Sequence, residues 1–154
     1  MSEAENYDDI LDRSWDDVQK PQVLPDGSWK LNCRNASYVA APAEDKSAKV
    51  LFFYEAVEPM DDVDVDALNA LGDEYDISEN DLVATFWVNK GKDWDKVRNH
   101  IKRHGIDVTG MTFKESFEAV RGGEIIGYLG TRTYENRAGL EVTDNEIIDF
   151  AEIE

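Results

Sequence analysis

The segment Leu82–Gly105, LVATFWVNKGKDWDKVRNHIKRHG, decides the fold of this chain. Its first seven residues, Leu82–Val88, are mostly β-branched or aromatic, which predicts a strand buried on at least one face. Three apolar residues then recur at helical spacing and predict a helix: Trp94, Val97 and Ile101. Asp93 is the expected N-cap of this helix, and Gly105 is expected to end it in the C′ position.

The opposite side of the predicted helix is basic. It carries Lys92, Lys96, Asn99, Lys102 and Arg103. Residues 82–105 hold six Lys and Arg against two Asp, whereas the whole chain has 16 Lys and Arg, 34 Asp and Glu and a net charge of −18. Any function assigned to the chain must therefore explain a local excess of cations in an acidic protein.

The negative charge is concentrated in three segments. Residues 1–20 have a net charge of −5, residues 58–81 of −10 and residues 138–154 of −6, which leaves +3 for the rest of the chain. We therefore interpret residues 21–150 as one domain that contains an acidic insert at 58–81. Residues 1–20 are expected to be an acidic arm or short helix, and residues 151–154 an acidic C-terminal tip.

Four further segments are predicted to be strands by their alternation and turn residues: Ser28–Val39, Ala48–Val57, Glu124–Tyr134 and Leu140–Phe150. Short helices are expected before Gly72 in the insert and after an N-cap at Thr112. The predicted fold is mainly β with helices (α+β). We expect a five-stranded barrel like the oligonucleotide-binding (OB) fold, with the basic helix between strands three and four and the insert between strands two and three. Another small barrel or an α+β sandwich is an alternative.

Three short segments resemble those of a known family. They are LPDG at 24–27 before the first strand, HGIDV at 104–108 at the end of the basic helix, and RTYEN at 132–136 after a glycine-bearing strand. This pattern, over about residues 22–150, is similar to phage-encoded single-stranded-DNA-binding proteins, from which the acidic insert is a departure. The resemblance implies an OB fold and a role in viral DNA replication or recombination.

The sequence contains no motif of the common hydrolases, metalloproteases or nucleotide-binding enzymes, so we expect no enzymatic activity and no cofactor. His100 and His104 have one metal-ligand spacing, but Cys33 is the only further soft ligand, and we interpret both as surface histidines. The run Asp62–Asp66 begins like a calcium loop, yet Ala67 replaces the required glycine. We therefore predict no metal site.

No apolar run approaches the roughly 20 residues that span a bilayer, and no secretory signal is visible. With a single cysteine no intramolecular disulfide can form, which fits an intracellular protein. We therefore expect a cytoplasmic protein, in the host cytoplasm if the protein is viral, with no membrane partner.

A protein that binds single strands without sequence preference needs cations for the phosphates and exposed aromatic rings for the bases. Such residues alternate along the predicted strands and continue into the basic helix. The predicted nucleic-acid-binding residues are Lys30, Arg34, Lys49, Phe53, Trp87, Lys90, Lys92, Tyr128, Arg132, Tyr134 and Arg137. Among the aromatic residues, we expect Tyr128 and Tyr134 to stack on bases and Trp94 and Phe117 to lie in the core.

The main hypothesis is therefore a non-enzymatic protein that binds single-stranded DNA, with a homodimer left open. The acidic C-terminus is expected to contact replication or recombination proteins, or to occupy the binding groove when DNA is absent. One rival hypothesis is an acidic interaction protein or DNA mimic that inhibits a host nucleic-acid enzyme. Another is an OB-type adaptor that binds protein only.

Overall fold

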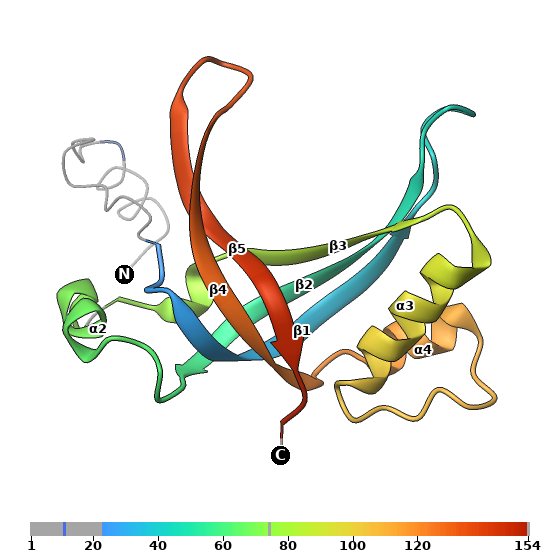
Figure 1. Ribbon diagram of the computed structural model, residues 1–154, viewed down its shortest axis with the longest axis horizontal. Coiled ribbons are helices and arrows are strands. Elements are labelled where there is room, and N and C mark those ends of the chain that lie inside the picture. The colour runs from blue at the N-terminus through green and yellow to red at the C-terminus, as the bar shows by residue number, and fades with distance from the viewer. Residues whose placement is uncertain (1–10, 12–22, 74, 154) are drawn as a thin grey trace.

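The computed structural model describes Leu11, residues 23–73 and residues 75–153. Five antiparallel strands form one sheet in the order β3-β2-β1-β4-β5 (Figure 1). The strands are β1 Gly27–Val39, β2 Ala48–Pro59, β3 Leu82–Val88, β4 Glu124–Glu135 and β5 Glu141–Ala151. The described helices are α2 Val65–Leu71, the 3-10 helix Ile77–Glu79, α3 Gly91–Lys102 and α4 Phe113–Ala119. Apart from Leu11, the predicted N-terminal arm lies outside the described residues.

The predicted mainly β fold with helices is confirmed, and so is the order of its elements. The five strands lie where the sequence placed them, with ends shifted by no more than two residues. The basic helix, α3, lies between β3 and β4, and the acidic insert joins β2 to β3. β5 extends to Ala151, which pairs with Ile126, so the strand takes the first residue of the predicted acidic tip.

The sheet curves strongly but does not close into a barrel within the described residues. Its edge strands β3 and β5 come into contact without forming a hydrogen-bonded ladder. Shifts of register interrupt β1 after Lys30 and after Cys33, and another interrupts the β4–β5 pair after Tyr128. Such bulges bend a strand and increase its twist, which lets the β1–β2 and β4–β5 hairpins rise as two separate arms (Figure 1).

The core lies on the concave side of the sheet. The alternation predicted for β1 is confirmed, because Trp29, Leu31 and Cys33 are buried there. β2 adds Phe52 and Tyr54, while its residues of opposite parity are only partly buried. α3 covers this core with the side that carries the predicted apolar stripe, as its buried residues are Val97, His100 and Ile101.

The start of α3 differs from the sequence prediction. Lys90, not Asp93, is the N-cap, and the helix begins at Gly91. The carboxylate of Asp93 turns back and accepts hydrogen bonds from the backbone N–H groups of Asn89 at 2.9 Å and Lys90 at 3.0 Å. These bonds hold the pKa of Asp93 below its usual value. Asp93 therefore stabilises the start of the helix from its third position. The C-cap of α3 is Arg103, so Gly105 lies at C″, one position beyond the predicted C′, with φ +81°.

The interpretation of His100 and His104 as surface histidines is wrong, because both are buried against Tyr54. Nδ1–H of His104 donates to the carbonyl oxygen of His100 at 2.8 Å, so Nε2 of His104 is an acceptor. Tyr54 O–H then donates to His104 Nε2 at 2.8 Å, and His100 Nε2–H donates to the Tyr54 oxygen at 2.6 Å. The remaining nitrogen, His100 Nδ1, has no partner. One neutral tautomer of each ring accounts for these three hydrogen bonds and leaves only His100 Nδ1 without a partner. We call Tyr54, His100 and His104 the Tyr54 cluster.

The acidic insert is fixed at the end of the sheet away from α3 and α4 (Figure 1). Asp62 accepts hydrogen bonds from Ser28 N–H at 2.9 Å and from the Ser28 hydroxyl at 2.8 Å, which lowers its pKa. Val63 beside it is buried in the core. The predicted insert helix is confirmed as α2, which Asp64 caps and Gly72 ends. The molecule therefore has an acidic end at α2 and a basic end at α3.

Candidate nucleic-acid interface

The convex side of β1, β2 and β3 presents a mixed aromatic and polar surface, which we call the outer sheet face. Residues paired across neighbouring antiparallel strands lie on the same face of a sheet. The register therefore places together on this face Lys30, Asn32, Ser37, Lys49, Leu51, Phe53, Glu55, Val83, Thr85 and Trp87. Of the predicted binding residues, Lys49 and Trp87 are thus directly paired, whereas Phe53 lies four residues further along β2, about 13 Å away.

Trp87 is the most exposed aromatic residue of the outer sheet face, with 57% of its surface accessible. Its partner across the β2–β3 ladder is Lys49, whose ammonium nitrogen lies 5.4 Å from the centroid of the indole ring. This is a cation–π arrangement. A cation and an exposed ring at one position can contact a phosphate and its base together.

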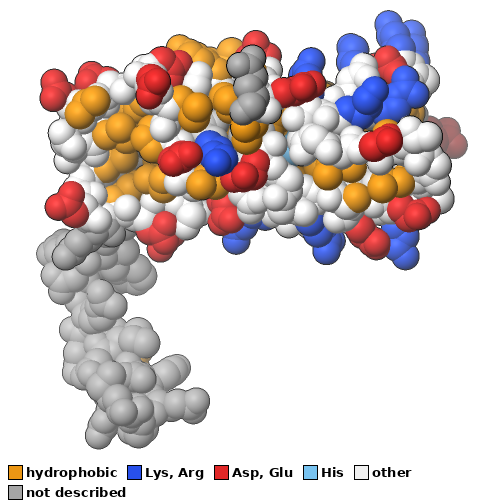
Figure 2. Space-filling model, turned by 90° about the horizontal axis from the view of Figure 1, so that it is seen from below, with side chains coloured by type: hydrophobic (Ala, Val, Ile, Leu, Met, Phe, Trp, Pro, Cys, Tyr) orange, Lys and Arg blue, Asp and Glu red, His pale blue; other side chains and the backbone are white. Residues whose placement is uncertain are grey.

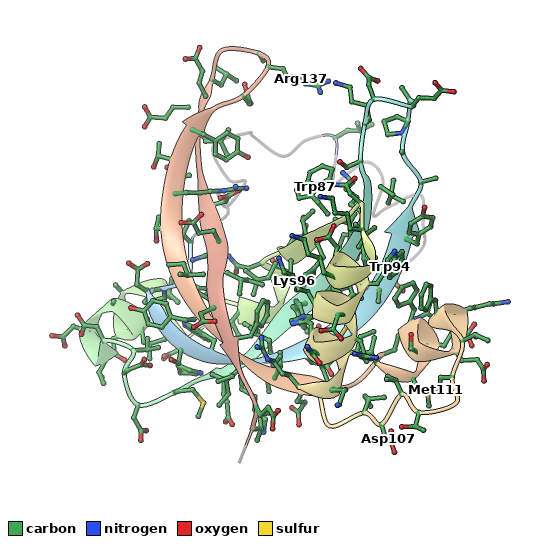
Figure 3. The ribbon with its side chains drawn as sticks, turned by 45° about the vertical axis from the view of Figure 1, so that its right-hand side comes forward. Trp87, Trp94, Lys96, Asp107, Met111 and Arg137 are labelled. Atoms are coloured by element: carbon green, nitrogen blue, oxygen red, sulfur yellow. The ribbon has the colours of Figure 1, made fainter. Side chains whose placement is uncertain are left out.

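A groove of about 500 Å³ separates Trp87 from the loop between β1 and β2. It is lined by Val39, Ala40, Pro42, Asp45, Lys46, Ser47, Lys49 and Trp87. Trp87 lies between the two hairpin arms (Figure 3). Lys46 is not among the residues predicted from the sequence, although a lysine three residues before Lys49 at a hairpin loop is a usable signal.

The second arm, the β4–β5 hairpin, carries a further aromatic–cation pair. The Arg132 guanidinium lies 5.0 Å from the ring centroid of Tyr134, of which 42% is exposed. Arg132 also forms an ion pair with Asp144 at 2.7 Å, which raises the pKa of the guanidinium. Arg137 lies at the tip of the hairpin (Figure 3). Arg132 is therefore partly neutralised, whereas Arg137 has no ion pair with a described residue.

The remaining predicted residues lie toward the acidic end of the molecule. Lys30 is 3.7 Å from each of two carboxylates, those of Glu58 and Glu124. Arg34 is 4.0 Å from Glu55. These carboxylates compete with phosphate for the two cations. Tyr128 is 43% exposed, but Asp149 is its partner across the β4–β5 ladder.

The predicted cations thus differ in whether a carboxylate neutralises them. Lys30, Arg34 and Arg132 each lie within 4.0 Å of a carboxylate. Four cations near Trp87 or at the hairpin tip form no ion pair with the described part of the chain: Lys49, Lys90, Lys92 and Arg137. Lys and Arg side chains gather at the α3–α4 end, while hydrophobic side chains cover more of the opposite half (Figure 2). The end of the interface near Trp87 is therefore better suited to bind a polyanion than the end near Lys30 and Arg34, because its cations are not neutralised by carboxylates of described residues.

Trp94 and Phe117 pack partly buried against the core, as expected. Trp94 also forms a stack that the sequence did not indicate. Its ring lies 4.4 Å from that of Phe113 at an interplanar angle of 14° and 6.0 Å from that of Tyr38. Phe113 is 60% exposed. This stack lies on the side of α3 away from Trp87 (Figure 3).

In the described part of the chain, no three His, Cys, Asp or Glu side chains are grouped so that they could hold a metal ion. The helices within those residues are all too short or too polar to cross a membrane. No protein-family model matches this sequence, and no curated protein matches it significantly. The function is therefore inferred from the geometry of the interface.

Proposed function

We propose that this protein is a non-enzymatic OB-type protein that binds single-stranded DNA largely without sequence preference. The connectivity supports this class. β1 pairs with both β2 and β4, β3 and β5 are the sheet edges, and α3 separates β3 from β4. An OB fold is a partly open five-stranded barrel that binds oligonucleotides on strands two and three and on the loops of the two hairpins. The Trp87 groove supports the proposal, because residues of β2, β3 and the β1–β2 loop line it.

The observation that carries the proposal is the exposed Trp87 ring with the Lys49 ammonium above it. A tryptophan is usually largely buried, because its burial contributes much hydrophobic free energy. Here the ring is accessible between two arms that carry Lys46 and Arg137. Stacking of one base on an aromatic ring contributes about 1–3 kcal/mol and depends little on base identity. This geometry supports binding without sequence preference.

The biological setting that we propose is viral DNA replication or recombination, where single strands are exposed. The acidic C-terminus would contact a replication or recombination protein, or occupy the groove in the absence of DNA. Ala151 belongs to β5, so the predicted tip begins at residue 152.

Fluorescence anisotropy with labelled oligo(dT) tests the proposal. Trp87→Ala should weaken binding by about 5-fold to 150-fold, which corresponds to the loss of one stacked base. Phe113→Ala is the matched control, because it removes an equally exposed ring on the other side of α3. The melting temperature of the Trp87 variant should stay close to that of the wild type. Equal affinities for both variants would refute the assignment of Trp87.

The DNA-mimic hypothesis retains one specific observation in its favour. Within residues 58–81, exposed aspartates follow each other with no Lys or Arg among them. A mimic would imitate phosphates with this acidic end and would bind no DNA of its own. Failure of the wild-type protein to bind oligo(dT) at about 0.05 M salt, where phosphate contacts are strongest, would favour the mimic.

A further inference from the structure

α3 carries a line of cations, of which only the first, Lys92, belongs to the interface described above. Positions separated by three or four residues lie on one side of a helix. One such line contains Lys92, Lys96, Asn99 and Arg103, and all four residues are exposed. We call it the α3 stripe. Over eleven residues a helix rises about 16 Å, so the stripe presents a cation or an amide at about each turn.

The core-facing side of α3 is occupied, and so is part of its flank toward α4, where Lys102 is exposed. Val97, His100 and Ile101 face the core. On the flank toward α4, Arg98 forms an ion pair with Asp95. The cations of the α3 stripe form no ion pair with any residue that the structure describes. Asp93 offsets part of the positive charge of Lys92 and Lys96, since both lower its pKa, but no carboxylate of the described residues pairs directly with them.

The α3 stripe continues from the Trp87 interface. Only Val88 and Asn89 separate Trp87 from Lys90, the N-cap of α3. Lys96 lies on the same side of α3 as Trp87, whereas Trp94, Met111 and Asp107 lie on the other side or below it (Figure 3). The α3–α4 end is also where Lys and Arg side chains gather (Figure 2).

We infer that a bound single strand leaves Trp87 and continues along α3, with its phosphates on Lys92, Lys96 and Arg103. This inference rests on the proposed function and extends it, because it adds a second section to the binding path. Bases would stack in the Trp87 groove, and the α3 stripe would hold only the backbone. Asn99, between the cations, donates one amide N–H to Asp95 at 3.4 Å, and its second N–H would donate to a phosphate oxygen.

The test compares two double variants that remove the same charge. Lys96→Gln with Arg103→Gln removes two cations of the α3 stripe. Lys102→Gln with Lys114→Gln removes two exposed cations elsewhere on α3 and α4. Affinities for oligo(dT) of about 4 and about 16 nucleotides, the two ends of the usual range of OB site sizes, would be measured between about 0.05 and 0.2 M salt. Circular dichroism would verify that each variant is folded.

For the longer strand, loss of two phosphate contacts should reduce the slope of log affinity against log salt by about 1.4. The gain in affinity between about 0.2 and 0.05 M salt should then be about sevenfold smaller than for the wild type. The short strand should be affected little, because it ends within the Trp87 groove. Equal slopes for the two double variants would overturn the inference while leaving the proposed function intact. A wild-type protein that binds neither strand would refute both.

Discussion

The Tyr54 cluster should make the stability of the fold depend on pH in the range where histidine titrates. Burial, with smaller contributions from His104 and Arg103, lowers the pKa of His100 from 6.5 to about 3. Burial also lowers the pKa of His104, against hydrogen bonds that raise it. A proton added to His100 would reside on Nδ1, which has no partner. The folded state therefore keeps His100 neutral and disfavours protonation of His104, whereas the unfolded chain takes up protons below about pH 6.5.

The sign and magnitude follow from this difference. Because the unfolded chain binds more protons, the free energy of unfolding falls as pH falls below about 6.5. For one histidine the loss is about 1.4 kcal/mol per pH unit, or about 2 kcal/mol at pH 5 from His100 alone. Hydrogen bonds keep the pKa values of Asp62, Asp76, Asp93 and Asp107 below 3.8, so these groups withdraw their stabilisation only at lower pH. Between pH 5 and 6.5 the histidine contribution is therefore separable.

Urea unfolding at pH 7.5 and pH 5 measures the effect. The chain has only two histidines, so His100→Gln with His104→Gln removes both. The double variant should be less stable than the wild type at pH 7.5, but its stability should change little between the two pH values. If the double variant is too unstable to study, the single variants can be measured instead. Each retains one histidine and should show a pH dependence of stability between those of the wild type and the double variant. An equal loss of stability in the wild type and the variants would show that the Tyr54 cluster does not control this pH dependence.

Four further perturbations have defined outcomes. Tyr134→Ala should weaken oligo(dT) binding by about 1–3 kcal/mol without lowering the melting temperature, whereas Trp94→Ala should lower stability by about 3 kcal/mol, and the reverse pattern would contradict the assignment of faces. Deletion of residues 152–154 should tighten binding at low salt, and an unchanged dissociation constant would show that the tip is not near the groove. Burial raises the pKa of the Cys33 thiol to about 11. A thiol reagent at pH 8 should therefore modify Cys33 only after the protein unfolds. Rapid modification of the native protein would contradict the burial of Cys33.

The local elements could be predicted from the sequence because their signals are local. Alternation along β1 and β2 and the helical spacing after Trp94 identify the core-facing residues. The cap of α3 was mistaken because aspartate favours both the N-cap and the third helical position, and only the backbone shows which N–H groups it accepts from. The burial of His100 depends on Tyr54, a residue 46 positions away, which no local pattern reveals.

For the candidate site too, the sequence predicts the features that depend on local patterns and not those that depend on distant residues. Strand alternation places Lys49 and Trp87 on an exposed face, and the register then brings them together. Alternation cannot show which cations meet carboxylates from other strands. Lys30 is the clearest case, because Glu58 and Glu124 come from the strands on either side of β1. The openness of the sheet likewise depends on contacts between β3 and β5, which are far apart in the sequence.

The most direct test of the central claim is the salt dependence of wild-type binding to a single strand and to a duplex of the same sequence. Near the groove and hairpin tip, the cations free of ion pairs with described residues are Lys46, Lys49, Lys90, Lys92 and Arg137. Five phosphate contacts predict a slope of about −3.5 for log affinity against log salt, or a steeper one if α3 contributes. The single strand should also bind more tightly than the duplex. No binding at about 0.05 M salt, or a preference for the duplex, would contradict the claim.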